Sequence, residues 1–122
     1  MRMRPQQQQE THDVVIEYLV EMLTDKYGAT YVHANPGSQK SFEVDGRWPD
    51  VVLVDKDGTV QAVFEVETED TVTMSHAKKQ WVAYAKQDAK LFLVVPEDCK
   101  HEAKRIIRTL GLAPKVESLM LY

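Results

Sequence analysis

Apolar residues recur every three or four positions near the start of the chain, between residues 11 and 28. Thr11 is a suitable N-cap for a helix in this segment, and Gly28 is suited to end it. This spacing predicts an amphipathic helix. Its apolar stripe consists of Val15, Tyr18, Leu19, Met22 and Leu23. Residues 1–9 contain four consecutive glutamines and no apolar periodicity, and we expect them to form a disordered tail.

The pattern then becomes that of strands. Residues 29–35 (ATYVHAN) predict a short strand, and residues 36–49 predict a polar loop because Gly and Pro interrupt them. Residues 50–68 contain two apolar-rich runs joined by the sequence DKDG, which is a typical hairpin signal. The middle of the chain is therefore expected to supply three strands.

Helical spacing returns in residues 75–87, where Ala77, Trp81 and Tyr84 are expected to face inward. Residues 90–96 (KLFLVVP) lie between two helical segments and predict a strand buried on both faces. A further helix is expected from Pro96 to Gly111, and a final strand at residues 115–122. The apolar stripe of that helix consists of Cys99, Ala103, Ile106, Ile107 and Leu110.

This order of elements, α-β-β-β-α-β-α-β, predicts an α/β fold with a mixed sheet and helices on both faces. The chain has 122 residues, which suits one core, and we assign residues 10–122 to a single domain. No apolar run approaches a membrane span, and the N-terminus lacks a signal-peptide pattern, so no membrane partner is expected. Cys99 is the single cysteine and favours a reducing, cytoplasmic location.

Charge is distributed unevenly along the chain. The net charge is −4, but residues 1–74 hold 6 Lys/Arg against 14 Asp/Glu, whereas residues 75–122 hold 9 Lys/Arg against 5 Asp/Glu. An acidic half beside a basic half suits a metal centre next to a track for a polyanion. It equally suits two solvated surfaces that attract each other.

Three acidic residues on the predicted hairpin are candidates for a metal site. Glu65 and Glu67 alternate with apolar residues and should share one face of the strand. Antiparallel pairing can bring Asp50, at the start of the first hairpin strand, opposite Glu65 near the end of the second. Carboxylate oxygens suit Mg²⁺ or Mn²⁺. The alternative interpretation is that these acids face solvent on a half-exposed sheet.

Pro49-Asp50, a hairpin and Glu65-Val66-Glu67 together resemble the PD-(D/E)XK nuclease signature. Gln80 and Tyr84, in the spacing QxxxY, are similar to a motif of RecB-type exonucleases. The resemblance covers roughly residues 10–95. It implies a restriction-endonuclease-like αβββαβ core, followed here by a C-terminal helix and strand. It further implies a metal held by Asp50 and Glu65, and hydrolysis of DNA.

The chain departs from this family at Glu67, where the family usually has a lysine. That lysine is thought to orient the attacking water and to stabilise charge on the phosphate. Glu67 can act instead as a base or as a metal ligand. Lys79 is a candidate for a replacement cation, although a solvated helix face explains it more simply. A third alternative is a domain that keeps the fold and has lost the chemistry.

Other candidates surround these acids in the sequence. Gln80 is expected either to contact the site or to bond locally to backbone, and Tyr84 is expected in the core or against nucleic acid. The resemblance implies that the first helix adds a carboxylate, for which Glu17 or Glu10 is the candidate, against the simpler interpretation of a solvated face. His33 is expected to be structural. The candidate contacts to nucleic acid are Lys40, Arg47, Lys78, Lys79 and Tyr84.

These observations lead to three functional hypotheses. The first is a Mg²⁺- or Mn²⁺-dependent nuclease acting on DNA, with Asp50, Glu65, Glu67 and Gln80 as catalytic residues and Glu17 as a further metal ligand. The second is a catalytically inactive module that binds nucleic acid or protein. The third is a structural subunit with no role in nucleic-acid binding. Because a domain of this size has little surface with which to grip a duplex, we also expect a homodimer or a larger assembly.

Overall fold

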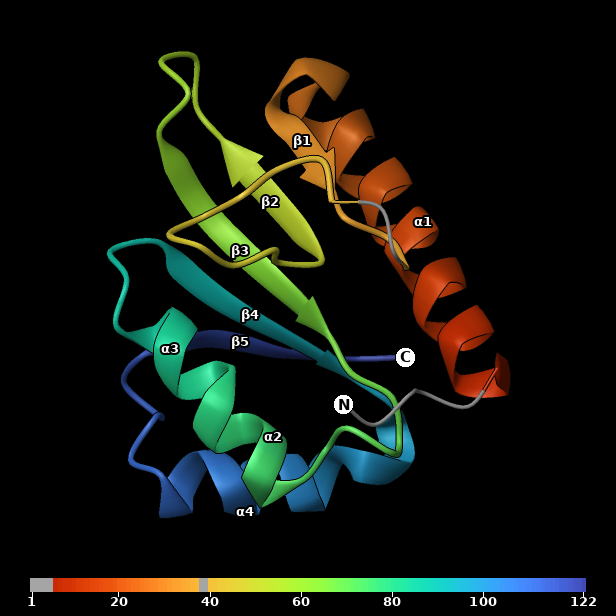
Figure 1. Ribbon diagram of the computed structural model, residues 1–122, viewed down its shortest axis with the longest axis vertical. Helices are drawn as coiled ribbons and strands as arrows, with labels where there is room; N and C mark the ends of the chain where they lie inside the picture. Colours follow the sequence, from red (N-terminus) through yellow and green to blue (C-terminus); the bar gives the residue numbers. More distant parts are fainter. Residues whose placement is uncertain (1–5, 38–39) are drawn as a thin grey trace.

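One mixed sheet runs through the molecule, and its strands follow each other in chain order (Figure 1). The structure is a computed structural model that describes residues 6–37 and 40–122. The first two pairings of the sheet are antiparallel and the last two are parallel. Its strands are β1 (Val32–Ala34), β2 (Val51–Val54), β3 (Val60–Val66), β4 (Lys90–Val95) and β5 (Val116–Leu121). The predicted α/β class with a mixed, helix-flanked sheet is thus confirmed.

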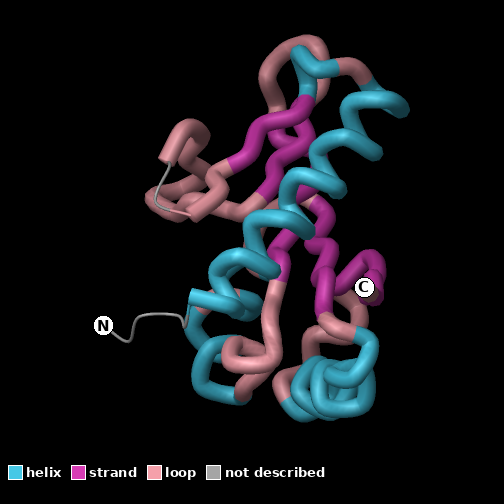
Figure 2. Tube along the Cα trace, turned by 90° about the vertical axis from the view of Figure 1, so that its right-hand side faces the viewer, coloured by secondary structure: helices cyan, strands magenta, loops and turns pink. Residues whose placement is uncertain are grey.

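Helices cover both faces of this sheet (Figures 1 and 2). Alternate residues of β3 separate the two cores, because Phe64 and Val66 pack with α1 whereas Val63 packs with α2, α3 and α4. No helix in the described ranges has the length and apolar character needed to cross a bilayer. The helices are α1 (Gln6–Tyr27), α2 (Met74–Lys79), α3 (Trp81–Ala85) and α4 (Lys100–Thr109), with 3₁₀ turns η1 (Ala29–Tyr31) and η2 (Glu97–Cys99).

The first helix differs from its prediction at its start and in its buried face. It begins at Gln6, so residues 6–9 are helical and not part of a tail, while residues 1–5 lie outside the described residues. Glutamine has a favourable helix propensity. In addition, Gln9 Nε2 donates to Asp13 Oδ1 at 2.9 Å, one turn away. The buried stripe is His12, Ile16, Leu19 and Leu23. Tyr18 and Met22, predicted to face the core, are 72% and 42% exposed.

Three other elements are shorter than predicted. The helix expected from Pro96 to Gly111 is α4 at Lys100–Thr109, preceded by the turn η2. The segment expected as one helix over residues 75–87 is divided at Gln80 into α2 and α3. Residues 29–31 form the turn η1, so that β1 contains only residues 32–34. The inward-facing residues Ala77, Trp81 and Tyr84 are buried as predicted, and so are Ala103, Ile106 and Ile107 of α4.

Asn35, directly after β1, fixes the loop that leads to β2. Its Nδ2 donates to the carbonyls of Phe42 and Pro49 at 2.8 and 2.6 Å. Its Oδ1 accepts from the amides of Ser41 and Phe42 at 2.7 and 2.8 Å. Asn35 is buried, so these four bonds replace water that the loop backbone cannot reach. The Asn35 side chain therefore fixes the position of the Pro49 backbone, directly before Asp50.

We predict that Asn35→Ala lowers the free energy of unfolding by about 2–3 kcal/mol, because it leaves several buried backbone groups without a partner. Urea unfolding at neutral pH measures this. Asn35→Asp, which keeps the acceptor and loses the donors, should fall between the wild type and the alanine variant. A change below about 0.5 kcal/mol in Asn35→Ala would show that the loop holds its conformation without this side chain.

Candidate functional site

Asp50 and Glu65 are neighbours across the β2–β3 hairpin, as the sequence predicted. Val51 pairs with Phe64, so Asp50 and Glu65 occupy the next position of the ladder. The Asp50 amide donates to Glu65 Oε2 at 3.1 Å, and Asp50 Oδ2 accepts from the Val66 amide at 2.8 Å. Two carboxylates therefore meet at the end of β3, each held by a backbone amide.

Glu65 is the acid of this group whose pKa is clearly raised. Its side chain is buried, with 6% of the residue exposed. Burial, followed by the charges of Asp50 and then Glu67, raises the pKa of Glu65 well above its ordinary value. Glu65 and Glu67 lie close enough to interact, as their shared strand face predicted. A cation or a proton is needed to relieve this concentration of negative charge.

His12 of α1 is the group that approaches Asp50 from outside the hairpin. Its Nε2 lies 3.0 Å from Asp50 Oδ1, and its Nδ1 lies 3.3 Å from Asp13 Oδ1. Both ring nitrogens can donate to these oxygens at the same time only when the imidazole is protonated. His12 thus links α1 to the first carboxylate of the site.

Glu67 has a second histidine, His76 of α2, as its partner. The Nε2 atom of His76 lies 3.2 Å from Glu67 Oε1 and 3.0 Å from Oε2, so the ring faces both carboxylate oxygens. Only 2% of Glu67 is exposed. The helix that carries His76 starts at the N-cap Thr73, whose hydroxyl accepts from the His76 amide at 3.2 Å.

The backbone of Glu67 is fixed by the parallel part of the sheet. Its amide donates to the Val94 carbonyl at 2.7 Å, which continues the β3–β4 pairing beyond Val66. The Tyr122 hydroxyl, which follows β5, donates to the Glu67 carbonyl at 2.6 Å. Three neighbouring strands therefore determine the position of this carboxylate.

Tyr84 and Gln80 form the wall of the site on the α3 side. Tyr84 is 2% exposed. Its pKa is raised, first by burial and then by Glu65 and Asp50, whereas the Arg47 guanidinium lowers it. Arg47 Nη1 donates to Gln80 Oε1 at 3.2 Å. The side-chain oxygen of Gln80 therefore accepts from a loop cation, Arg47, whose charge acts on the neighbouring Tyr84.

Several predicted site residues lie elsewhere. Glu17 is exposed on α1 and, among the described residues, neither a hydrogen bond nor a salt bridge connects it to the cluster. The helical face that points at Asp50 is that of His12, so the contribution of the first helix is an imidazole in place of the carboxylate of Glu17 or Glu10. Tyr84 is core and does not present its ring to nucleic acid. Lys40, Lys78 and Lys79 are exposed, and the Lys40 Nζ lies 6.0 Å from the ring centroid of Trp48.

The cluster is not a ready metal cage. Over residues 6–37 and 40–122, no group of three or more His, Cys, Asp or Glu side chains is arranged to hold an ion. Asp50 and Glu67 instead face histidines, and Glu65 faces an amide. The expected convergence of three carboxylates on one ion is therefore reduced to a closely spaced pair, Asp50 and Glu65, with Glu67 beside it.

Sequence reasoning missed four residues that shape this site: His12, His76, Asn35 and Tyr122. For His12 a signal existed, because positions 12, 16, 19 and 23 have helical spacing and the last three are apolar. His33, which was expected to be structural, stacks its ring on Phe42 with a centroid distance of 4.4 Å. No local pattern indicates the contacts of His76 and Tyr122, which depend on the tertiary fold.

A comparison of the chain with known protein families, curated proteins and solved structures finds no match.

We predict that Glu65 makes the protein less stable as the pH rises. A folded-state pKa above the unfolded value gives stability that is complete below about pH 4.5, the ordinary pKa, and is lost above it. Between the two pKa values, the loss reaches about 1.4 kcal/mol per pH unit. Urea unfolding in EDTA from pH 4.5 to 8 should therefore show a smaller decline in Glu65→Gln than in the wild type.

The exposed Glu43 supplies the control for this measurement, because Glu43→Gln should keep the wild-type pH dependence. Parallel pH curves for the wild type and Glu65→Gln would contradict the electrostatic stress assigned to Glu65.

Proposed function

We propose that the protein is a divalent-metal-dependent hydrolase of phosphodiester bonds, with DNA as its substrate. One observation carries the proposal: the buried Glu65 carboxyl lies next to Asp50 and Glu67, and its pKa is raised first by burial and then by the charges of these two acids. Natural proteins tolerate such a concentration of acids mainly where a function requires it. The resemblance of Pro49-Asp50 and Glu65-Val66-Glu67 to the PD-(D/E)XK signature supports the same reaction class.

Asp50 and Glu65 are the residues we assign to hold the metal. Mg²⁺ commonly takes one or two carboxylates and completes its shell with waters and substrate phosphate, so a pair of acids is sufficient. Hard oxygen donors suit Mg²⁺ and Mn²⁺. When bound, such an ion polarises the phosphate and lowers the pKa of a coordinated water. His12 holds Asp50 in its orientation, as groups bonded to ligating carboxylates do in other metal sites.

Glu67 is assigned to accept the proton of the attacking water. It occupies the position where the PD-(D/E)XK family usually has lysine, and a carboxylate is a competent general base. His76, 3.0–3.2 Å from both of its oxygens, keeps the carboxylate oriented. Arg47, held by Gln80 at 3.2 Å, supplies positive charge beside the cluster and is assigned to the phosphate.

Exposed lysines near the same end of the sheet are assigned to the DNA backbone. Lys78 and Lys79 lie on α2, which also carries His76 and ends at Gln80. Lys40 lies on the loop that leads to Asp50. Phosphate contacts of this kind position a nucleic acid without reading its sequence.

A second candidate function is a DNA-binding module without catalysis. The observation that favours it is that two of the three acids already face histidines, which can compensate their charge without an ion. Such a module binds DNA equally well in EDTA and in Mg²⁺. The hydrolase, in contrast, is stabilised by the ion: at ten times the dissociation constant, Mg²⁺ adds about 1.4 kcal/mol to the free energy of unfolding.

We predict Mg²⁺- or Mn²⁺-dependent nicking of supercoiled plasmid, lost in Asp50→Asn and Glu65→Gln, because each variant removes one ligand charge while keeping side-chain shape. Gel assays with plasmid, single-stranded and branched DNA measure this. The control is Asp57→Asn, which removes a charge from the β2–β3 turn at the far end of the hairpin and should retain activity. Equal residual nicking in all of these proteins indicates a contaminant and refutes the assignment.

We also predict that Lys78→Glu/Lys79→Glu weakens DNA binding and reduces its salt dependence. Each lost phosphate contact should lower the slope of log K against log salt by about 0.9 for duplex DNA, since fewer counterions are released. Fluorescence anisotropy at several salt concentrations gives the slope. The matched variant Lys26→Glu/Lys56→Glu changes two lysines away from α2 and should bind almost as the wild type does. If both double variants weaken binding alike, α2 is not the DNA-binding surface.

A further inference from the structure

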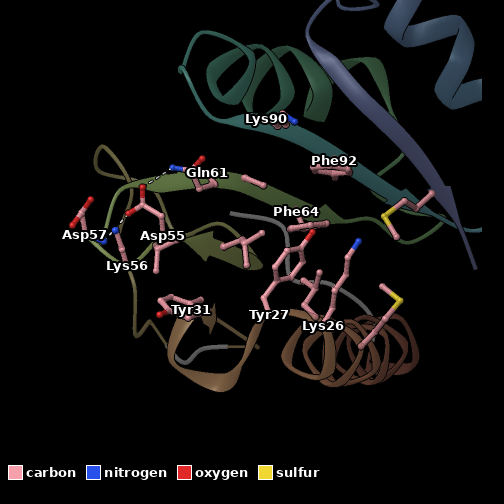
Figure 3. Close-up of a pocket in the computed structure, with 16 residues that line it drawn as sticks. Lys26, Tyr27, Tyr31, Asp55, Lys56, Asp57, Gln61, Phe64, Lys90 and Phe92 are labelled. Atoms are coloured by element: carbon pink, nitrogen blue, oxygen red, sulfur yellow. Dashed lines mark hydrogen bonds between the residues drawn. The ribbon is translucent and has the colours of Figure 1, made fainter.

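A groove of about 850 Å³ lies between the C-terminal part of α1 and the sheet (Figure 3). Ala62 and Phe64 of β3 face it, whereas Val63 of the same strand belongs to the opposite core with Tyr84. The groove is therefore on the other face of the sheet from α3 and its wall of the carboxylate site. What binds in this groove is independent of the function proposed above.

The floor and walls of the groove are apolar and aromatic. Phe64 and Phe92 stack on the floor with their ring centroids 4.6 Å apart and an interplanar angle of 14°. Met22 of α1 and Met120 of β5 both line it, and thioether side chains adapt to ligands of different shape. In Figure 3, Tyr27 extends from α1 towards Phe64. A volume of this size with a mainly apolar lining is typical of small-molecule sites.

The charged residues of the groove favour an anion. Lys26, Lys56 and Lys90 line it, and within the described residues Lys26 and Lys56 form no salt bridge. Lys90 has one distant partner, Glu117, at 3.7 Å. The opposing carboxylate of Asp55 is bonded to its own turn, because it accepts from the amides of residues 57 and 59 at 2.9 and 3.0 Å and from Gln61 Nε2 at 3.0 Å. Asp57 is the second carboxylate of the lining, so three lysines stand against two aspartates. Lys26 Nζ lies 5.2 Å from the Tyr27 ring centroid and has no ion-pair partner among the described residues.

We propose that this groove binds a small amphiphile with an apolar body and a single anionic head group, such as a carboxylate or a phosphate ester. The body lies on the Phe64–Phe92 floor between the two methionines. The head group is bound by Lys26 on α1, and the positive charge of Lys90 on β4 acts at longer range.

Calorimetric titration of the full chain with dodecanoate, below its micelle concentration, tests the proposal. We expect saturable binding of one molecule, with dodecyl phosphate comparable. Dodecanol and dodecyltrimethylammonium should bind at least tenfold more weakly because they lack the anionic head. Lys26→Gln should weaken dodecanoate binding about threefold to fivefold, as expected for a partly exposed ion pair, and Lys90→Gln should weaken it less. Lys104→Gln, on α4, should leave it unchanged.

A matched pair of variants on α1 distinguishes binding in the groove from nonspecific adsorption to the surface of the helix. Met22→Glu introduces a negative charge into the groove lining, whereas Tyr18→Glu introduces the same charge one turn earlier, at an exposed residue outside it. Met22→Glu should weaken dodecanoate binding at least tenfold and Tyr18→Glu less than twofold, with circular dichroism confirming that both are folded.

Three results overturn the proposal. Equal weakening by both glutamate variants indicates adsorption to the apolar surface of α1. Equal binding of the cationic amphiphile excludes recognition of an anion by the lysines. Absence of dodecanoate binding, with sedimentation showing a dimer that Met22→Glu dissociates, assigns the groove to a second copy of the chain.

Discussion

The arrangement of the molecule depends on how three acidic side chains are accommodated at one end of the sheet. Two unit charges 4 Å apart repel by about 4 kcal/mol at an effective dielectric constant of 20, and burial adds the cost of lost hydration. Asp50 faces His12, Glu67 faces His76, and Glu65 accepts from an amide and has a raised pKa. The three carboxylates thus have partners on three different elements, so these contacts connect α1, the hairpin and α2.

The backbone makes this concentration of charge persist. The register of β2 and β3 sets Asp50 beside Glu65, the parallel pairing with β4 holds the amide of Glu67, and Asn35 anchors the loop before Asp50. None of these contacts is itself acidic or basic. The hydrogen-bonded frame therefore keeps the acids together against their repulsion.

The parts of the structure that depend on local pattern could be predicted from the sequence. The DKDG turn and the alternation around it predicted the neighbouring positions of Asp50 and Glu65, and the stripe of α4 predicted its buried residues. The prediction was wrong for the buried face of α1, where more than one helical face carries apolar residues. Helix α1 has apolar residues on adjacent faces, and its buried face includes His12, so Tyr18 and Met22 were placed inside although they are exposed. The histidine partners could not be predicted. A contact such as that of Glu67 with His76 depends on how residues 68–73 turn the chain between β3 and α2, and no local pattern specifies this turn.

The chain topology has a consequence for the order in which the site assembles. Asp50 and Glu65 belong to one hairpin, and a loop this short closes at small entropic cost and on a microsecond timescale. His12 comes from a helix 38 positions before Asp50, and its contact forms only when α1 docks on the sheet. We therefore expect the two acids to meet before the imidazole reaches them. Until α1 docks, the charge of Asp50 is not offset by His12, so we expect the docking of α1 to stabilise the closed hairpin.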